Sequence, residues 1–332
     1  MSDPYMTKTD KLRSAEEIRT LGLLLIDGFS LMSYASVIEV FRAANALAGR
    51  TLYRWSHISV DGRPIHASNG ATILADFAVG QPFDCETLFV FAGGDPTGFS
   101  DARTFAWLRR MAAQGAVITG VSAGPFLLAR AGLLDGYRAT IHWEHRPVFV
   151  ETFPNVSPET VLFVIDRRRV TCAGGMAGLD LAIEMIEREQ GYGLSSIISD
   201  WFIRTDTRRA DRPQRLSLRE RHQVSNDTVL KVLAHMEETV EEPSPRETLA
   251  KIAEVSVRQL ERLFRNHLSA TMRESYMRIR LEKSEQLLRT TALSVTQVAL
   301  ACGFQSASHF SRSFRDRYGK PPSGRARRDR ES

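Results

Sequence analysis

The carboxyl-terminal half of the chain contains an internal repeat of a helix-like segment. Residues 257–264 (VRQLERLF) line up with residues 307–314 (ASHFSRSF) at an offset of 50. The matching pairs are Leu260 with Phe310, Arg262 with Arg312, and Phe264 with Phe314. Because residues four apart share one face of a helix, the repeat predicts two copies of one small helical unit in this half of the chain.

Each copy also has the signals of a capped helix. Ser256 and Ser306 precede the repeated segments and suit the N-cap position. A short helix-like stretch with an alanine on its packing face, Ala250 or Ala299, comes before each serine. A short helix, a tight turn and a capped second helix form the helix-turn-helix layout. Residues 273–288 between the copies are long enough for a rigid spacer helix.

The charge of the chain is divided unevenly between its halves. Residues 244–332 hold 18 Lys and Arg against 9 Asp and Glu, a net charge of +9, whereas the remainder has a net charge of −4. A basic module joined to a nearly neutral one is an electrostatic candidate for nucleic-acid binding. On charge alone, a solvated basic surface is an equally good interpretation.

The second helix of each copy should supply the contacts to DNA. In a helix-turn-helix its exposed early residues face base edges, while neighbouring Arg and Lys bind phosphates. Arg and Gln can make bidentate contacts with guanine and adenine respectively. The residues expected to contact DNA are Arg258, Gln259, Arg262, Gln305, Ser308 and Arg312. Further exposed candidates are Val257, Glu261, Ala307 and Ser311. The residues expected in the core are Leu260, Leu263, Phe264, Phe310 and Phe314.

The amino-terminal half alternates between strand-like and helix-like stretches. The expected strands are residues 21–26, 87–92 and 116–121. The expected helices are residues 31–48, 105–111, 124–131 and 177–189. This alternation predicts an α/β fold with a mostly parallel sheet and helices on both faces. In such sheets ligands bind at the carboxyl ends of the strands.

The region between the halves is rich in arginine and poor in apolar residues. We expect an exposed connector at residues 205–224. The predicted organisation is therefore an α/β domain at 18–203, a linker at 204–225 and an all-α domain at 226–325. Pro243 and Pro245 should follow a helix that ends near Val240.

A nucleophile-elbow pattern lies in the amino-terminal half. Residues 120–124 (GVSAG) match G-x-S-x-G, at the end of an expected strand and the start of an expected helix. Taken alone, the pattern favours a serine hydrolase with Ser122 as nucleophile and His142 as base. Asp135 and Glu144 are near His142 in sequence only. Ser122 could instead cap the following helix, and His142 could be a core histidine.

The carboxyl-terminal half resembles the AraC-type DNA-binding domain. The resemblance rests on residues 294–304 (SVTQVALACGF), 306–314 and 319–322, with support from 260–264 and 278–284. It covers about residues 226–325. Glu254 departs from the pattern, because the first turn in this family commonly has glycine.

The amino-terminal half resembles the PfpI-like, class I glutamine-amidotransferase-like domain, which has a flavodoxin-like sandwich. The residues that carry the resemblance are 27–29, 39–41, 91–94, the elbow, 131–136 and 139–143. Joined to an AraC-type domain, such a domain is similar to those of GlxA-like transcriptional regulators.

The resemblance implies a binding site rather than an active site. Enzymes of the superfamily have cysteine at the elbow, followed by a histidine, and an acid in the first loop; the corresponding residues here are Ser122, His142 and Ser33. Serine is a poor nucleophile unless a base activates it. The expected ligand-binding residues are Gly94, Asp95, Ser122, His142 and Trp143.

Regulators of this kind commonly sense small nitrogenous metabolites, including arginine and quaternary amines such as glycine betaine and carnitine. Trp143 could hold a cation against its ring, although core packing is the favoured interpretation of that residue. Asp95 could supply an opposite charge.

The resemblance further implies double-stranded DNA, a small effector, RNA polymerase and a second copy of the chain as partners, with no cofactor. The three cysteines are far apart and show no metal-ligand spacing. Residues 1–17 lack a secretory signal, and no apolar run approaches the ~20 residues needed to cross a bilayer. We therefore expect a cytoplasmic protein without a membrane span. A DNA-bound hydrolase and a pure interaction protein are the alternatives, and the sign of regulation is left open.

Overall fold

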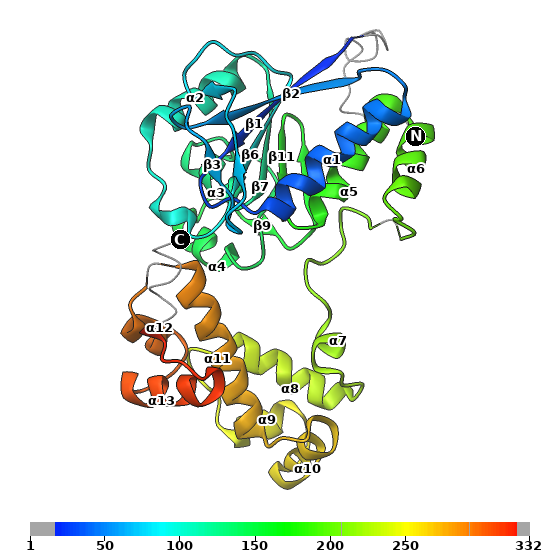
Figure 1. Cartoon of the computed structure of the whole chain (residues 1–332). Helices are drawn as coiled ribbons and strands as arrows, with labels where there is room; N and C mark the ends of the chain where they lie inside the picture. Colours follow the sequence, from blue (N-terminus) through cyan, green and yellow to red (C-terminus); the bar gives the residue numbers. More distant parts are fainter. Residues whose placement is uncertain (1–16, 207, 292, 324–332) are drawn as a thin grey trace. The chain divides into compact units, whose positions relative to one another are not determined.

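The structure, a computed structural model, describes residues 17–206, 208–291 and 293–323. The chain divides into an amino-terminal unit that ends at Gln214 and a carboxyl-terminal unit that begins at Arg215. Each unit is described by itself (Figure 1). The expected lack of a signal at residues 1–16 and the end of the predicted all-α domain at 325 lie outside the described residues.

The amino-terminal unit is built on a seven-stranded sheet in the order β10-β11-β7-β6-β1-β2-β5. Its strands are β1 (Arg19–Leu25), β2 (Tyr53–Ser59), β5 (Phe77–Ala78), β6 (Thr87–Ala92), β7 (Val117–Ser122), β10 (Phe163–Asp166) and β11 (Arg169–Cys172). All neighbours are parallel except β10 and β11. Two small two-stranded sheets pair β3 (Ile65–His66) with β4 (Thr72–Ile73) and β8 (Ala139–Thr140) with β9 (Pro158–Glu159).

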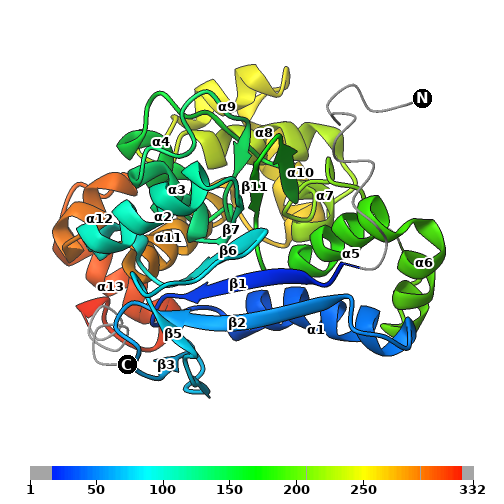
Figure 2. The same cartoon turned by 90° about the horizontal axis from the view of Figure 1, so that it is seen from above.

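Helices cover both faces of this sheet, as predicted. One face packs against α1 (Leu31–Leu47) and α5 (Ala177–Gln190), and α6 (Tyr192–Trp201) packs against these two helices. The other packs against α2 (Ala102–Ala113), α3 (Gly124–Arg130) and α4 (Arg146–Thr152). Figure 2 shows α1 and α2 on opposite sides of β1 and β6. The central strands β1, β6 and β7 are nearly all buried, because parallel strands with helices on both sides have no face toward water.

The described part of the carboxyl-terminal unit is helical. Its helices are α7 (Leu218–His222), α8 (Asp227–Glu238), α9 (Arg246–Ile252), α10 (Val257–Leu268), α11 (Met272–Thr290), α12 (Val295–Ala301) and α13 (Ala307–Tyr318). The pairs α9–α10 and α12–α13 are the two helix-turn-helix copies, and α11 is the predicted spacer helix. One hydrophobic core unites both copies and includes Leu260, Phe264, Phe310 and Phe314.

The predicted connector is mostly exposed, but it is not merely a loose link. Its first part belongs to the amino-terminal unit and ends at Gln214. Its second part contains α7, which a Ser217–Glu220 capping box begins and which packs against α8. The sequence did not predict α7 or the contacts of the first part, because the segment has few apolar residues and polar contacts hold it instead.

Candidate functional site

Ser122 lies on a sharp, strained turn between β7 and α3. Its φ of +62° is in the left-handed region, which a serine adopts at a cost. A Cβ at Gly120 would lie 2.8 Å from the Pro125 nitrogen, and a Cβ at Gly124 would overlap the Val90 carbonyl. Only glycine fits at these two positions, so the G-x-S-x-G pattern does form a nucleophile elbow here. The Ser122 side chain does not cap α3, whose N-cap is Ala123.

Loops from four strands meet around Ser122. Ala92 at the end of β6 is its register partner on the neighbouring strand. A Cβ on Gly174, after β11, would lie 2.7 Å from the Ser122 Cβ and 2.8 Å from the Ser33 Oγ. A Cβ on Gly93 would lie 2.6 Å from the Gly28 carbonyl oxygen, after β1. The carboxyl ends of the central strands therefore converge on one site, where ligands bind in open α/β sheets.

Ser33 occupies the place that the resemblance assigns to an acid, and it has a structural task there. Its side chain is buried, with the residue 2% exposed. The Gly175 amide donates to the Ser33 Oγ at 2.8 Å, and the Ser36 hydroxyl donates to the Gly175 carbonyl at 2.7 Å. The serines of α1 thus fix the loop after β11 against the site, and they bring no carboxylate to it.

His142 lies beside Ser122 and is not a core histidine. Its backbone amide donates to the Ser122 carbonyl at 3.3 Å, and its side chain is 28% exposed. The Glu144 amide donates to His142 Nδ1 at 3.3 Å. In a hydrolytic triad the same nitrogen donates to an acid. The nearest Glu144 carboxylate oxygen is 3.9 Å from Nδ1.

The three other predicted ligand residues differ in their exposure and in their contacts. Trp143 is half-buried, so the favoured expectation of core packing is wrong; its ring centroid lies 5.6 Å from that of His142. Gly94 is exposed with a φ of +59°. Asp95 caps the short 3₁₀ helix η2 (Pro96–Gly98): its Oδ1 accepts from the Thr97 amide at 2.9 Å and from the Thr97 hydroxyl at 2.6 Å.

No cysteine of the chain is available as a substitute nucleophile. Cys85, Cys172 and Cys302 are all buried. Burial raises the pKa of each thiol to about 12, so each is protonated at neutral pH.

The two predicted DNA-contacting helices expose the same face. Residue by residue, α10 and α13 have an identical pattern of buried, half-buried and exposed positions. The predicted contacts Arg258, Gln259, Arg262, Gln305, Ser308 and Arg312 are all exposed. Leu260, Phe264, Phe310 and Phe314 are fully buried, as predicted, and Leu263 is half-buried. Ser256 and Ser306 are the N-caps that the sequence predicts.

Two of the candidate contacts have other partners within the unit. The Gln259 Oε1 accepts from the Ser256 amide and hydroxyl, both at 2.9 Å, and completes a capping box. Glu261 is half-buried rather than exposed, and its carboxylate accepts from the Met272 amide at 3.4 Å. Gln259 can therefore contact adenine through both Oε1 and Nε2 only by giving up this cap. Glu261 instead joins α10 to α11.

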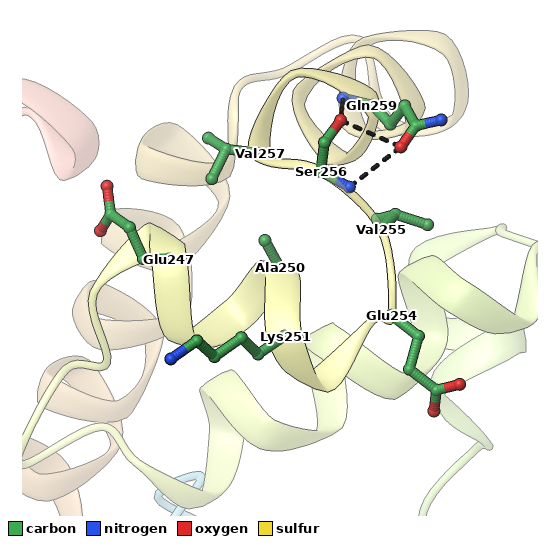
Figure 3. A pocket seen from close by; sticks show the side chains of 8 residues that line it. All are labelled: Glu247, Ala250, Lys251, Glu254, Val255, Ser256, Val257 and Gln259. Atoms are coloured by element: carbon green, nitrogen blue, oxygen red, sulfur yellow. Dashed lines mark hydrogen bonds between the residues drawn. The ribbon is translucent and has the colours of Figure 1, made fainter.

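The first helix-turn-helix holds a groove of about 540 Å³ between α9 and the start of α10. Figure 3 shows Ala250 and Lys251 on one side and the Ser256–Gln259 capping box on the other. Glu254, in the turn, has a φ of +57° and pairs with Lys231 at 2.9 Å. The turn of the second copy has Gly303 instead, where a Cβ would lie 2.6 Å from the Val240 carbonyl oxygen. The departure at Glu254 therefore leaves the turn intact.

Comparison with known proteins agrees with this division into two units. Residues 21–188 match the DJ-1/PfpI family, and residues 249–328 match a helix-turn-helix domain. The chain is 43% identical to the HTH-type transcriptional regulator CdhR of Pseudomonas aeruginosa, over 90% of this chain and 89% of that one. It is 39% identical to the HTH-type transcriptional regulator GlxA of Rhizobium meliloti, over 95% of this chain and 97% of that one.

The chain belongs to the family of HTH-type transcriptional regulators that carry a DJ-1/PfpI domain. Among solved structures, it is similar to an AraC family transcriptional regulator from Pseudomonas putida, with a TM-score of 0.52 and 25% identity over 55% of this chain and 99% of that one. As a member of this family, the chain is a DNA-binding transcription regulator.

Sequence reasoning missed several arginines of this regulator's DNA-binding unit. Arg265 and Arg315 are exposed, and they occupy the same position of α10 and α13. The repeat offset pairs them, so the signal was present in the sequence. Arg280 of α11 donates from Nε to the Cys302 carbonyl at 2.8 Å, and its guanidinium lies 4.1 Å from the centroid of Phe304. Arg280 thus fixes the turn of the second helix-turn-helix, a contact that sequence spacing does not reveal.

Among the described residues, no group of three or more His, Cys, Asp or Glu side chains is placed to hold a metal ion. Within the same residues, no helix is both long and apolar enough to cross a membrane.

Proposed function

We propose that the amino-terminal unit senses a small nitrogenous metabolite, of the amino-acid or quaternary-amine class, without converting it. The observation that carries this proposal is the set of hydrogen bonds around the elbow. Ser122 is presented on a strained turn, but Ser33 is engaged with Gly175 and His142 Nδ1 accepts from a backbone amide. A site with this arrangement can bind through a hydroxyl and an imidazole, while Ser33 stands where the enzymes of the resemblance have the acid of their catalytic machinery.

The proposed ligand site contains Gly94, Asp95, Ser122, His142 and Trp143. The half-buried Trp143 ring beside His142 supports a cationic ligand, because a cation over such a ring gains about 0.5–2 kcal/mol. The Asp95 carboxylate, after β6, supports the same choice of charge. Arginine and glycine betaine are the ligands of first choice for the test, since regulators that this chain resembles sense such compounds.

In the carboxyl-terminal unit we propose specific contacts through Arg258, Arg262, Gln305, Ser308 and Arg312, with Gln259 as a contact that competes with its own cap. The exposed and matching faces of α10 and α13 support a contact of each helix with a major groove of DNA. We further propose a cytoplasmic homodimer that acts on RNA polymerase. Light scattering that gives a monomer at every concentration, with and without DNA, would contradict the dimer.

The experiment that tests sensing against catalysis measures recovery of the ligand. The full chain is incubated with L-arginine or glycine betaine, the remaining ligand is quantified, and DNA binding is titrated for wild type and Ser122→Ala in parallel. For a sensor, we expect complete recovery, and the loss of one hydrogen bond should weaken binding by about 0.5–1.5 kcal/mol in Ser122→Ala. Basal DNA binding should be unchanged.

A hydrolase would give a different result in the same experiment. The strained elbow at Ser122 is the feature that favours that second function. Multiple turnovers of ligand by wild type, abolished in Ser122→Ala, would identify the unit as an enzyme and overturn the sensor.

A further inference from the structure

The connector is anchored on the amino-terminal unit through a buried carboxylate. Asp180 of α5 is 3% exposed. Arg204 donates to its Oδ1 at 2.6 Å, and Arg208 donates to its Oδ2 at 2.6 Å. Both carboxylate oxygens are thus bound by arginines at or next to the start of the connector. Asp180 lies in the first turn of α5, which begins directly after the Gly174–Gly175 loop of the ligand site.

A second anchor lies at the end of the connector. The Gln214 Nε2, with two hydrogens to donate, lies within hydrogen-bond distance of three acceptors: the Ile141 carbonyl at 2.9 Å, the Val161 carbonyl at 2.8 Å and the Thr140 hydroxyl at 3.0 Å. Between the anchors, the Leu162 amide donates to the Ala210 carbonyl at 3.0 Å. We call these contacts of residues 204–214 the clasp. Its last member binds the residue that immediately precedes His142.

We propose that Gln214 is a positioning residue of the ligand site and couples it to the DNA-binding unit; this rests on the proposed ligand-binding function. Gln214 lies outside residues 21–188, which match the DJ-1/PfpI family, and it is the last residue before the carboxyl-terminal unit. A single side chain thus holds the backbone that presents His142 and also fixes the point at which the chain leaves the unit. Coupling between two sites requires such an element, whose equilibrium both sites bias.

The sign of the coupling follows from the arrangement of the bonds. In the clasped state, in which the contacts of the clasp are formed, Gln214 holds Ile141 and Arg204 holds Asp180 at the start of α5. His142 and the Gly174–Gly175 loop are therefore held where a ligand would meet them. A ligand that needs this arrangement binds the clasped state more tightly and shifts the equilibrium toward it. By reciprocity, loosening the clasp weakens ligand binding by the same factor.

The test compares the full-length wild type with Gln214→Glu and Gln114→Glu. Glutamate has the size of glutamine but cannot donate, so Gln214→Glu sets a carboxylate against two carbonyl oxygens. Gln114→Glu makes the same chemical change at the exposed C-cap of α2. Trypsin cleavage of the Arg209–Ala210 and Arg215–Leu216 bonds, followed by mass spectrometry, reports the clasp. L-arginine and glycine betaine are the probes, with affinity measured by calorimetry and binding to DNA by titration.

We expect Gln214→Glu to be cut about 3- to 10-fold faster than wild type, the effect of losing one or two net hydrogen bonds. A probe that binds wild type should slow the cleavage of wild type by trypsin. The same probe should bind Gln214→Glu about 3- to 10-fold more weakly, and it should not change the affinity of Gln214→Glu for DNA. Gln114→Glu should behave as wild type in every measurement. A merely structural role of Gln214 would lower the Tm without removing the effect of the ligand on cleavage.

Each contrary result has one meaning. If Gln214→Glu is cut no faster than wild type, the clasp does not hold the connector and the inference is overturned. If a probe raises the Tm of wild type but leaves its cleavage unchanged, the inference fails while ligand sensing stands. If neither probe raises the Tm, the proposed ligand class fails, and DNA affinity alone decides the inference. In that case, a DNA affinity of Gln214→Glu that differs from that of wild type by less than about 3-fold overturns it.

Discussion

Alanine substitutions at the two glycines after β11 distinguish an effect on the proposed ligand site from an effect of backbone strain alone. Gly174 and Gly175 have φ values of +84° and +55°, so alanine at either position costs about 1–2 kcal/mol in the left-handed region. A Cβ at Gly175 meets nothing within 4 Å, whereas a Cβ at Gly174 would lie 2.7 Å from the Ser122 Cβ. Relieving that overlap adds about 1–3 kcal/mol.

The two variants should therefore differ in stability and in ligand binding. A unit of this size loses roughly 2–4 °C of Tm per kcal/mol, so we expect losses of roughly 2–8 °C for Gly175→Ala and roughly 4–20 °C for Gly174→Ala. Calorimetry with L-arginine or glycine betaine should show binding by Gly175→Ala and little or none by Gly174→Ala. Retained DNA binding by both variants serves as the control for folding. Equal ligand affinity in the two variants would refute the placement of the site around Ser122.

Three further predictions concern the carboxyl-terminal unit. Arg280→Met removes the hydrogen bond to Cys302 and the contact with Phe304, so the free energy of unfolding of the unit should fall by about 1.5–3 kcal/mol in a denaturant titration. The control Arg273→Met, at an exposed position, should leave this free energy unchanged. Glu254→Gly relieves a left-handed φ and should raise the Tm of the unit, whereas Glu247→Gly inside α9 should lower it. A lower Tm for Glu254→Gly than for Glu247→Gly would contradict the strain at Glu254. Burial raises the pKa of Glu237, but His222 and a bidentate Arg221 outweigh burial and lower the pKa from 4.5 to about 2. Because the folded pKa is depressed, this stabilisation is complete above about pH 5 and is lost as the pH falls toward 2, so thermal melts of Glu237→Gln should depend less on pH than those of wild type across that window.

The sequence predicts the central strands better than the outer ones, for a physical reason. The strand expected at residues 87–92 coincides with β6, because a strand buried on both faces consists of apolar residues throughout. Sequence reasoning missed β2, whose residues Tyr53–Ser59 mix polar and apolar side chains. It also missed the four-residue β11, which is too short to show a pattern.

The candidate residues of both sites could be found from motifs, but their partners could not. The elbow and the repeat identify Ser122 and the faces of α10 and α13 by local spacing. The bond from Gly175 to Ser33 joins residues 142 positions apart, and the bond from Gln214 to Ile141 joins residues 73 positions apart. Such contacts depend on how the strands are ordered in the sheet, which local sequence does not encode.

The most direct test of the central claim is an equilibrium titration of the full chain onto DNA, with and without ligand. A site is first enriched from random-sequence DNA with the wild-type protein. We expect two half-sites about one helical turn apart and an affinity at least ~10³-fold above that for scrambled DNA. L-arginine or glycine betaine should shift this affinity while being recovered unchanged. Equal affinity for the enriched and the scrambled sequences, unaffected by either compound, would contradict a ligand-responsive regulator.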